Sequence, residues 1–121
     1  MLWCALQSTP AASAPTLAPH RVLWLFAESR NQPELVEQRK RLEAAPLELA
    51  ERDVRIEEVI GPHEARQRWR APDRGFLLVL VGKDGTAKMR RSQPVALAEI
   101  LSLIDGMPMR KAEMEQRRQR P

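Results

Sequence analysis

This 121-residue sequence has little of the residue types that carry much of protein chemistry. It contains one cysteine, two histidines and no tyrosine. The single cysteine, Cys4, excludes an intramolecular disulfide and any zinc site built on paired cysteines. His20 and His63 lack the spacing of a ligand pair, so we expect neither a metal site nor a cofactor.

Long apolar runs are missing as well. Apart from the N-terminal segment, the longest uncharged apolar run is residues 75–82. This is far shorter than the roughly 18 residues that a transmembrane helix needs, so we expect no membrane span. A chain of this length with 43% hydrophobic residues has room for one core. We therefore expect one folded domain, at residues 21–109.

Charge is unevenly distributed along the chain. The formal net charge is +4, and residues 110–121, with five basic and two acidic side chains, supply +3 of it. We interpret this segment as a basic tail outside the domain. Because the body is close to neutral and the tail has no interleaved aromatics, nucleic-acid binding is not expected.

The N-terminal segment, residues 1–20, is rich in Pro, Ala, Ser and Thr and has no charge before His20. Two interpretations stay open. It is a disordered lead-in, or it is the remnant of a secretory signal, because an apolar start at 1–6 precedes a small-x-small pattern at 12–14. The signal is incomplete, since its apolar run is short and no basic region precedes it. A start codon upstream of Met1 would explain that pattern.

From Arg21 onward the chain alternates strand and helix patterns. Apolar runs and period-two alternation predict strands near 22–27, 54–60, 76–82 and 87–91. Helical patterns cover about 31–52, 63–70 and 97–105. Asn31 is the expected cap of the first helix, and Pro46 predicts a kink or a break within it. Asp84-Gly85 is typical of a tight hairpin between the last two strands.

This order predicts an α/β fold with a mixed four-stranded sheet and helices on both faces. Strands joined by helices favour parallel pairing, whereas a hairpin forces antiparallel pairing. The same order is that of the thioredoxin-like three-layer sandwich, and "LWLFAESRNQP" resembles the strand-to-helix junction where thioredoxins hold Cys-x-x-Cys. Here Arg30 and Pro33 stand at the cysteine positions, so thiol–disulfide oxidoreductase activity is not expected.

Two motifs, "FLLVLVGKDGTAKMR" and "IDGMPMRKAEM", together resemble a bacterial family known as domain of unknown function forty-one seventy-four, which is related to domains of sushi-repeat extracellular proteins. The resemblance spans about residues 20–115. It implies a thioredoxin-like or peroxiredoxin-like fold without the redox pair, no established activity, and a periplasmic or secreted location, with a cytoplasmic one as the alternative. The family-like positions are Gly82, Lys83, Asp84, Gly85, Asp105, Met107, Pro108, Met109 and Arg110.

The vacant redox junction is the first candidate site. Glu28, Ser29, Arg30 and Asn31 lie where a strand runs into a helix. A helix start offers unpaired amides and Arg30 offers a planar fork of donors, so this junction is a hypothetical anion site. The alternative is that Arg30 is a solvated loop residue.

The "MPMR" turn is the second candidate site. Met107, Met109 and Met114, with Arg110 beside them, would form an adaptable contact surface, because thioethers repack easily. The alternative is that these methionines close the core after the last helix.

Two function classes remain. The leading interpretation is a noncatalytic, thioredoxin-like binding or interaction module whose partner is an unknown protein or a small anionic ligand. The alternative is an enzyme of unknown reaction that uses Glu28 and Arg30 at the vacant junction. One arginine and one carboxylate supply no nucleophile, so the binding module is favoured.

Overall fold

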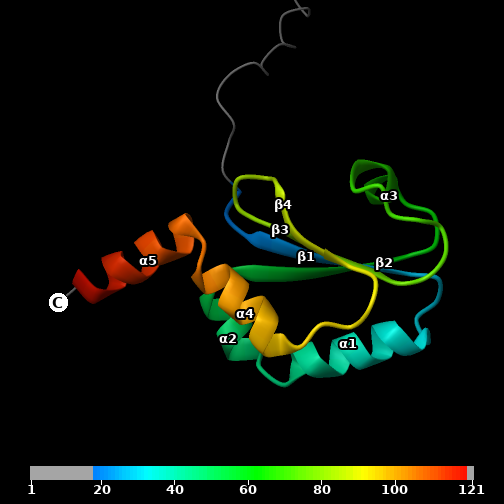
Figure 1. Ribbon diagram of the computed structural model, residues 1–121, viewed down its shortest axis with the longest axis horizontal. Helices are drawn as coiled ribbons and strands as arrows, with labels where there is room; N and C mark the ends of the chain where they lie inside the picture. Colours follow the sequence, from blue (N-terminus) through cyan, green and yellow to red (C-terminus); the bar gives the residue numbers. More distant parts are fainter. Residues whose placement is uncertain (1–17, 120–121) are drawn as a thin grey trace, which may run out of the picture.

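A computed structural model describes residues 18–119, in which one mixed sheet carries helices on both of its faces (Figure 1). The elements in chain order are β1 (Arg21–Ala27), α1 (Pro33–Glu43), α2 (Pro46–Glu51), β2 (Val54–Ile60), α3 (Glu64–Arg68), β3 (Leu77–Val81), β4 (Ala87–Arg91), α4 (Leu97–Asp105) and α5 (Pro108–Gln119). The predicted α/β class and the mixed four-stranded sheet are confirmed.

The strands lie in the order β2-β1-β3-β4. The helical connection makes β1 and β2 parallel, while β1 with β3 and β3 with β4 are antiparallel. The turn between β3 and β4 depends on Gly85, whose φ of +83° suits a residue without a Cβ. Asp84 supports this turn, because its Oδ1 accepts hydrogen bonds from the backbone N–H and the hydroxyl of Thr86.

The larger core lies on the face covered by α1, α2 and α4, which are on the same side of the sheet in Figure 1. Leu35, Leu42 and Leu49, which recur at sevens in the sequence, are all buried there. The predicted helix break is also confirmed. Pro46 lacks an N–H and clashes with the preceding turn, so α1 ends at Glu43 and a second helix begins at Pro46.

The opposite face carries a smaller core beneath α3, which is a short helix of 5 residues. Its position is fixed by Arg66, a buried cation that donates to the carbonyl oxygens of Ala27 (2.8 Å), Gly61 (2.6 Å) and Pro72. The guanidinium also lies over the ring of Phe26, 5.6 Å from its centroid. Arg66 thus ties the end of β1 to the loops on both sides of α3.

Two features differ from the sequence expectations. The N-cap of α1 is Gln32, not Asn31, because Pro33 takes the first helical position. Residues 110–119, which we interpreted as a tail, belong to α5, and Arg110 is 1% exposed. The boundary at residue 109 therefore falls inside a helix whose first turn packs on the domain. The expectations for Cys4 and the rest of residues 1–17 lie outside the described residues.

Candidate binding site at the start of β1

The junction after β1 is the first place to look for a site. Glu28, Ser29, Arg30 and Asn31 are all exposed. The backbone N–H of Glu28 donates to the side-chain oxygen of Gln32 (2.6 Å), and the Glu28 carboxylate accepts from the N–H of Gly75 (2.6 Å). Glu28 therefore closes the loop before β3 onto the end of β1, which is a structural role.

A shallow hollow lies at this junction, lined by Glu28, Ser29, Asn31, Gln32, Pro33 and Glu34. Two of the lining side chains are carboxylates, and Arg30 is not among them. An anion at the start of α1 would meet these two negative charges, which oppose the attraction of the helix terminus. The lining thus gives the anion hypothesis at this junction little electrostatic support.

The other end of β1 is built very differently. Arg21, its first residue, is 0% exposed. Its guanidinium donates to the carbonyl oxygen of Arg52 (2.7 Å) and reaches both carboxylate oxygens of Glu113 (3.4 and 3.2 Å). A buried cation of this kind requires paired partners, and here they come from the end of α2 and from α5.

Lys83 joins the same group from the β3–β4 hairpin. Its ammonium lies 2.8 Å from Asp53 and 2.8 Å from Glu113. Burial would raise the pKa of Glu113, but the hydrogen bonds from Lys83 and Arg21 outweigh it and hold that pKa below its ordinary value. The hydrogen bond from Lys83 likewise lowers the pKa of Asp53.

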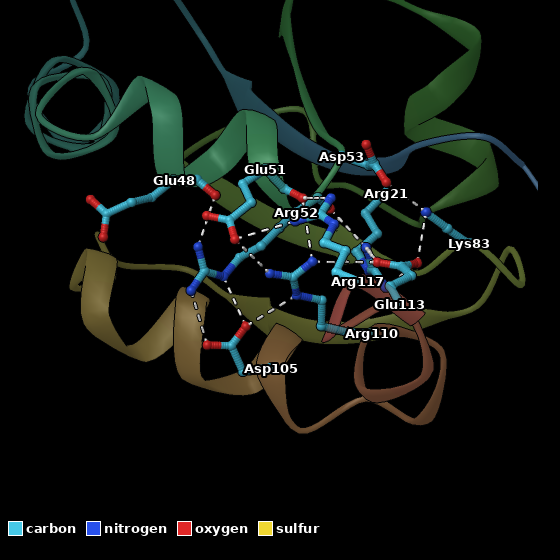
Figure 2. A network of polar contacts seen from close by, with 10 residues as sticks. All are labelled: Arg21, Glu48, Glu51, Arg52, Asp53, Lys83, Asp105, Arg110, Glu113 and Arg117. Atoms are coloured by element: carbon cyan, nitrogen blue, oxygen red, sulfur yellow. Dashed lines mark hydrogen bonds and ion pairs between the residues drawn. The ribbon is translucent and has the colours of Figure 1, made fainter. Parts of the chain in front are cut away.

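Arg110, in the first turn of α5, belongs to the same group. Its guanidinium lies within 3.6 Å of carboxylates on Glu51, Asp105 and Glu113. Asp105 also accepts two hydrogen bonds from Arg52 (2.9 and 3.0 Å), and the first cause of its lowered pKa is this contact. Figure 2 shows these side chains converging from separate elements. We call the group the charged cluster: Arg21, Glu51, Arg52, Asp53, Lys83, Asp105, Arg110, Glu113 and Arg117.

A cavity of about 200 Å³ adjoins the charged cluster, between the β3–β4 hairpin and the turn from α4 to α5. We call it the hairpin pocket. Its lining residues are Arg21, Gly82, Lys83, Asp84, Lys88, Met107, Pro108 and Met109. Seven of these eight, all but Arg21, belong to the two motifs that carried the family resemblance. Residues about 25 positions apart in the sequence therefore build one cavity.

The structure places the predicted contact residues in different settings. Met107 is buried in the larger core, Met109 is half-buried and lines the hairpin pocket, and Arg110 lies in the charged cluster. The sequence analysis did not identify Arg21 or Glu113 as site residues. An arginine directly before a continuous apolar strand was the one available signal for Arg21.

A larger hollow of about 350 Å³ lies between α1, α2 and the edge strand β2. Leucine, valine, isoleucine and proline side chains dominate its wall. Its charged residues Arg39 and Glu58 pair with each other at 2.9 Å. Glu43 is the one further charged residue of its lining, so this hollow offers few convergent polar groups and is less suited to specific binding.

Within residues 18–119, no group of three or more His, Cys, Asp or Glu side chains is arranged to hold a metal ion. No helix of that segment is long and apolar enough to cross a membrane.

No curated protein and no solved structure matches the chain. Residues 17–113 match a family model, and since this is most of the chain, the protein belongs to the family described as domain of unknown function (DUF4174).

Proposed function

We propose that this protein is a noncatalytic, thioredoxin-like binding module and that it binds its partner or ligand at the hairpin pocket. The observation that carries the proposal is the composition of this cavity. The "GKD" segment of the hairpin and the "MPM" segment after α4 meet there with Arg21. Convergent polar groups beside an apolar wall are the usual composition of a ligand site.

The thioredoxin-like part of the proposal is supported by topology. The strand order β2-β1-β3-β4, with one parallel and two antiparallel pairs, has α1 and α4 on one face and α3 on the other. In this topology the end of β1 and the start of α1 correspond to the position of the redox cysteines. Ser29 and Arg30 precede Gln32 and Pro33 there, with no thiol.

The noncatalytic part rests on the chemistry of the pocket lining. The lining has no Cys, Ser, Thr or His. Burial would lower the pKa of Lys83, but its hydrogen bonds to Asp53 and Glu113 outweigh that effect and raise it. Lys83 is therefore held as an ammonium ion, which cannot attack an electrophile. The hydrogen bond from the Thr86 amide leads the effects that lower the pKa of Asp84 to about 2, so Asp84 stays ionised.

The test is a fragment screen by NMR on the full chain, with neutral, anionic and cationic compounds in equal number. We expect the amides of residues 82–88 and 107–110 to shift and those of 28–35 to stay in place. Met109→Ala should weaken the binding of the hits. Met114→Ala is the matched control, because Met114 is a half-buried methionine of α5 outside the pocket lining.

Two outcomes would overturn the proposal. One is a set of hits that maps to residues 28–35. The other is robust turnover in an insulin-reduction assay that disappears in Cys4→Ser, because disulfide exchange requires a thiolate.

The relation to domains of sushi-repeat extracellular proteins, and with it export, belongs to the proposal as well. It is supported by the two motifs and by the small-x-small pattern at residues 12–14. Fractionation of cells that carry the natural gene tests it, and recovery of the protein only from the cytoplasm would contradict it.

A further inference from the structure

The polar groups that remain free at the hairpin pocket are donors. Arg21 lines the pocket, and its buried Nε has no hydrogen-bond partner within residues 18–119. Lys83 uses two of its three N–H groups, on Asp53 and Glu113, and Lys88 uses one, on Asp84. Lys83 and Lys88 therefore retain N–H groups for a ligand, whereas the buried Arg21 contributes its positive charge.

The nearby carboxylates are already engaged. The Asp84 oxygens accept from Thr86 and Lys88. The Glu113 oxygens accept from Arg21 and Lys83, and Arg110 lies 3.6 Å from one of them. Because the wall offers two ammonium groups with free N–H donors beside the buried guanidinium of Arg21, the group that best fits it brings acceptor oxygens and a negative charge.

The rest of the pocket wall is apolar. Met107, Pro108 and Met109 line it with side chains that offer a ligand no N–H or O–H group. Thioether side chains adapt to the shape of an apolar body. With a volume of about 200 Å³, the cavity fits a group of the size of one side chain and is smaller than most cofactor sites.

From these observations we infer that the hairpin pocket binds a carboxylate group carried on a short apolar stem. The inference rests on the proposed function and names its ligand class. The carboxylate meets the free N–H groups of Lys83 and Lys88 and the positive charge of Arg21, and the stem packs on the methionines. A doubly charged phosphate suits the site less well for two reasons. The ionised Asp84 also lines the pocket and repels a second negative charge, and phosphate has no apolar stem to pack on the methionines.

The experiment is an NMR titration of the full chain with isovalerate, with its uncharged amide, isovaleramide, and with inorganic phosphate. Isovalerate should give saturable shifts at residues 82–88 and 107–110, with a dissociation constant on the order of 1 mM, as expected for so small a ligand. Isovaleramide and phosphate should each bind about tenfold more weakly, since one lacks the charge and the other lacks the stem.

Two variants probe the donors without removing Arg21 from the charged cluster. Lys88→Met replaces the ammonium with an apolar end, and we expect about tenfold weaker binding of isovalerate. Gly82→Ala would place a Cβ 2.8 Å from Cε of Lys88 and so displace this flexible side chain, with a smaller loss of about threefold. Lys111→Met is the matched control, because Lys111 is exposed on α5 outside the pocket lining, and its affinity should equal that of the native chain.

The carboxylate could belong to a free organic acid or to the end of a polypeptide. The peptide acetyl-Gly-Gly-Leu with a free carboxyl end distinguishes the two sources when compared with its C-terminal amide and with isovalerate. Tighter binding of the free-acid peptide than of isovalerate would assign the site to a protein C-terminus. Equal or weaker binding would assign it to a small acid.

The inference fails if isovalerate gives no saturable shifts at the pocket, if phosphate or isovaleramide binds as tightly, or if Lys88→Met leaves the affinity unchanged. Neutral fragments that still bind at residues 82–88 and 107–110 would then leave the proposed function standing. If no fragment of any charge binds there, the proposed function fails together with the inference.

Discussion

The two ends of β1 are built in opposite ways. After Ala27 the chain is exposed, and its polar groups mainly close a loop onto the strand. At Arg21 the chain is buried, and cations and carboxylates from five other segments converge on it (Figure 2). A resemblance in sequence pointed to the end of the strand, whereas the burial of charge points to its beginning. Burial is the more informative signal, because buried charges must be paired.

Of the variants at the two ends of β1, the one that removes the Glu113 carboxylate should lower the free energy of unfolding most. Glu113→Gln would leave Arg21, Lys83 and Arg110 without their shared carboxylate, and Glu113 is only 21% exposed. We expect the free energy of unfolding to fall by about 3 kcal/mol, as for a broken buried ion pair. Urea denaturation measures this change.

Glu115→Gln is the matched control for that variant. Glu115 lies on the same helix, but among residues 18–119 it pairs only with Arg118 and Gln119, and it is exposed. Its loss should cost less than about 0.5 kcal/mol. Equal costs for the two variants would show that the charged cluster contributes no more than surface pairs.

Acid should remove the stability that the carboxylates of the charged cluster contribute. The pKa values of Asp53, Asp105 and Glu113 are lower in the folded protein than in the unfolded chain. Their contribution to stability is therefore complete above about pH 5 and is lost as the pH falls through and below the ordinary carboxyl range. Urea midpoints between pH 7 and pH 2.5 should decrease less for Glu113→Gln than for the native chain. Parallel curves would contradict this linkage.

At the other end of β1, Glu28→Ala should have a local effect. The variant removes the acceptor of the Gly75 N–H. Because the contact is exposed, we expect a loss of less than about 1 kcal/mol in the free energy of unfolding. Hydrogen exchange at the Gly75 amide should become about fivefold faster, while exchange in β3 stays unchanged. Slower exchange in the variant would mean that Glu28 does not hold this loop.

The smallest effect is expected for Arg30→Ala. Arg30 is exposed, and the hollow at the junction does not include it. Its removal should change stability by less than about 0.5 kcal/mol and leave the binding of isovalerate unchanged. A variant that lost binding would move the ligand site to the junction and reverse the comparison between the two ends of β1.

The elements of the fold were predictable because their causes are local. Periodicity located the strands and the helices up to α4, Pro46 marked the break between α1 and α2, and Asp84-Gly85 marked the hairpin. The charged cluster was not predictable in this way. Arg21 and Glu113 are 92 residues apart, and Arg110 and Glu51 are 59 apart, so no window of sequence contains both partners. The first turn of α5 was interpreted as tail because its charged residues suggested solvent, whereas their partners lie on other elements.

The same separation along the chain has a consequence for the order of events during folding. A protein is synthesised from its N-terminus, so Arg21 and Lys83 exist before Glu113 has been added. Until then, Lys83 can pair with Asp53, while the carboxylate partner that Arg21 has in residues 18–119 is still missing. Contacts between distant residues also form late, because a long loop must close first. We therefore expect the sheet to form first around the hairpin and the end of β1. The packing of α5 against the start of β1 should follow last.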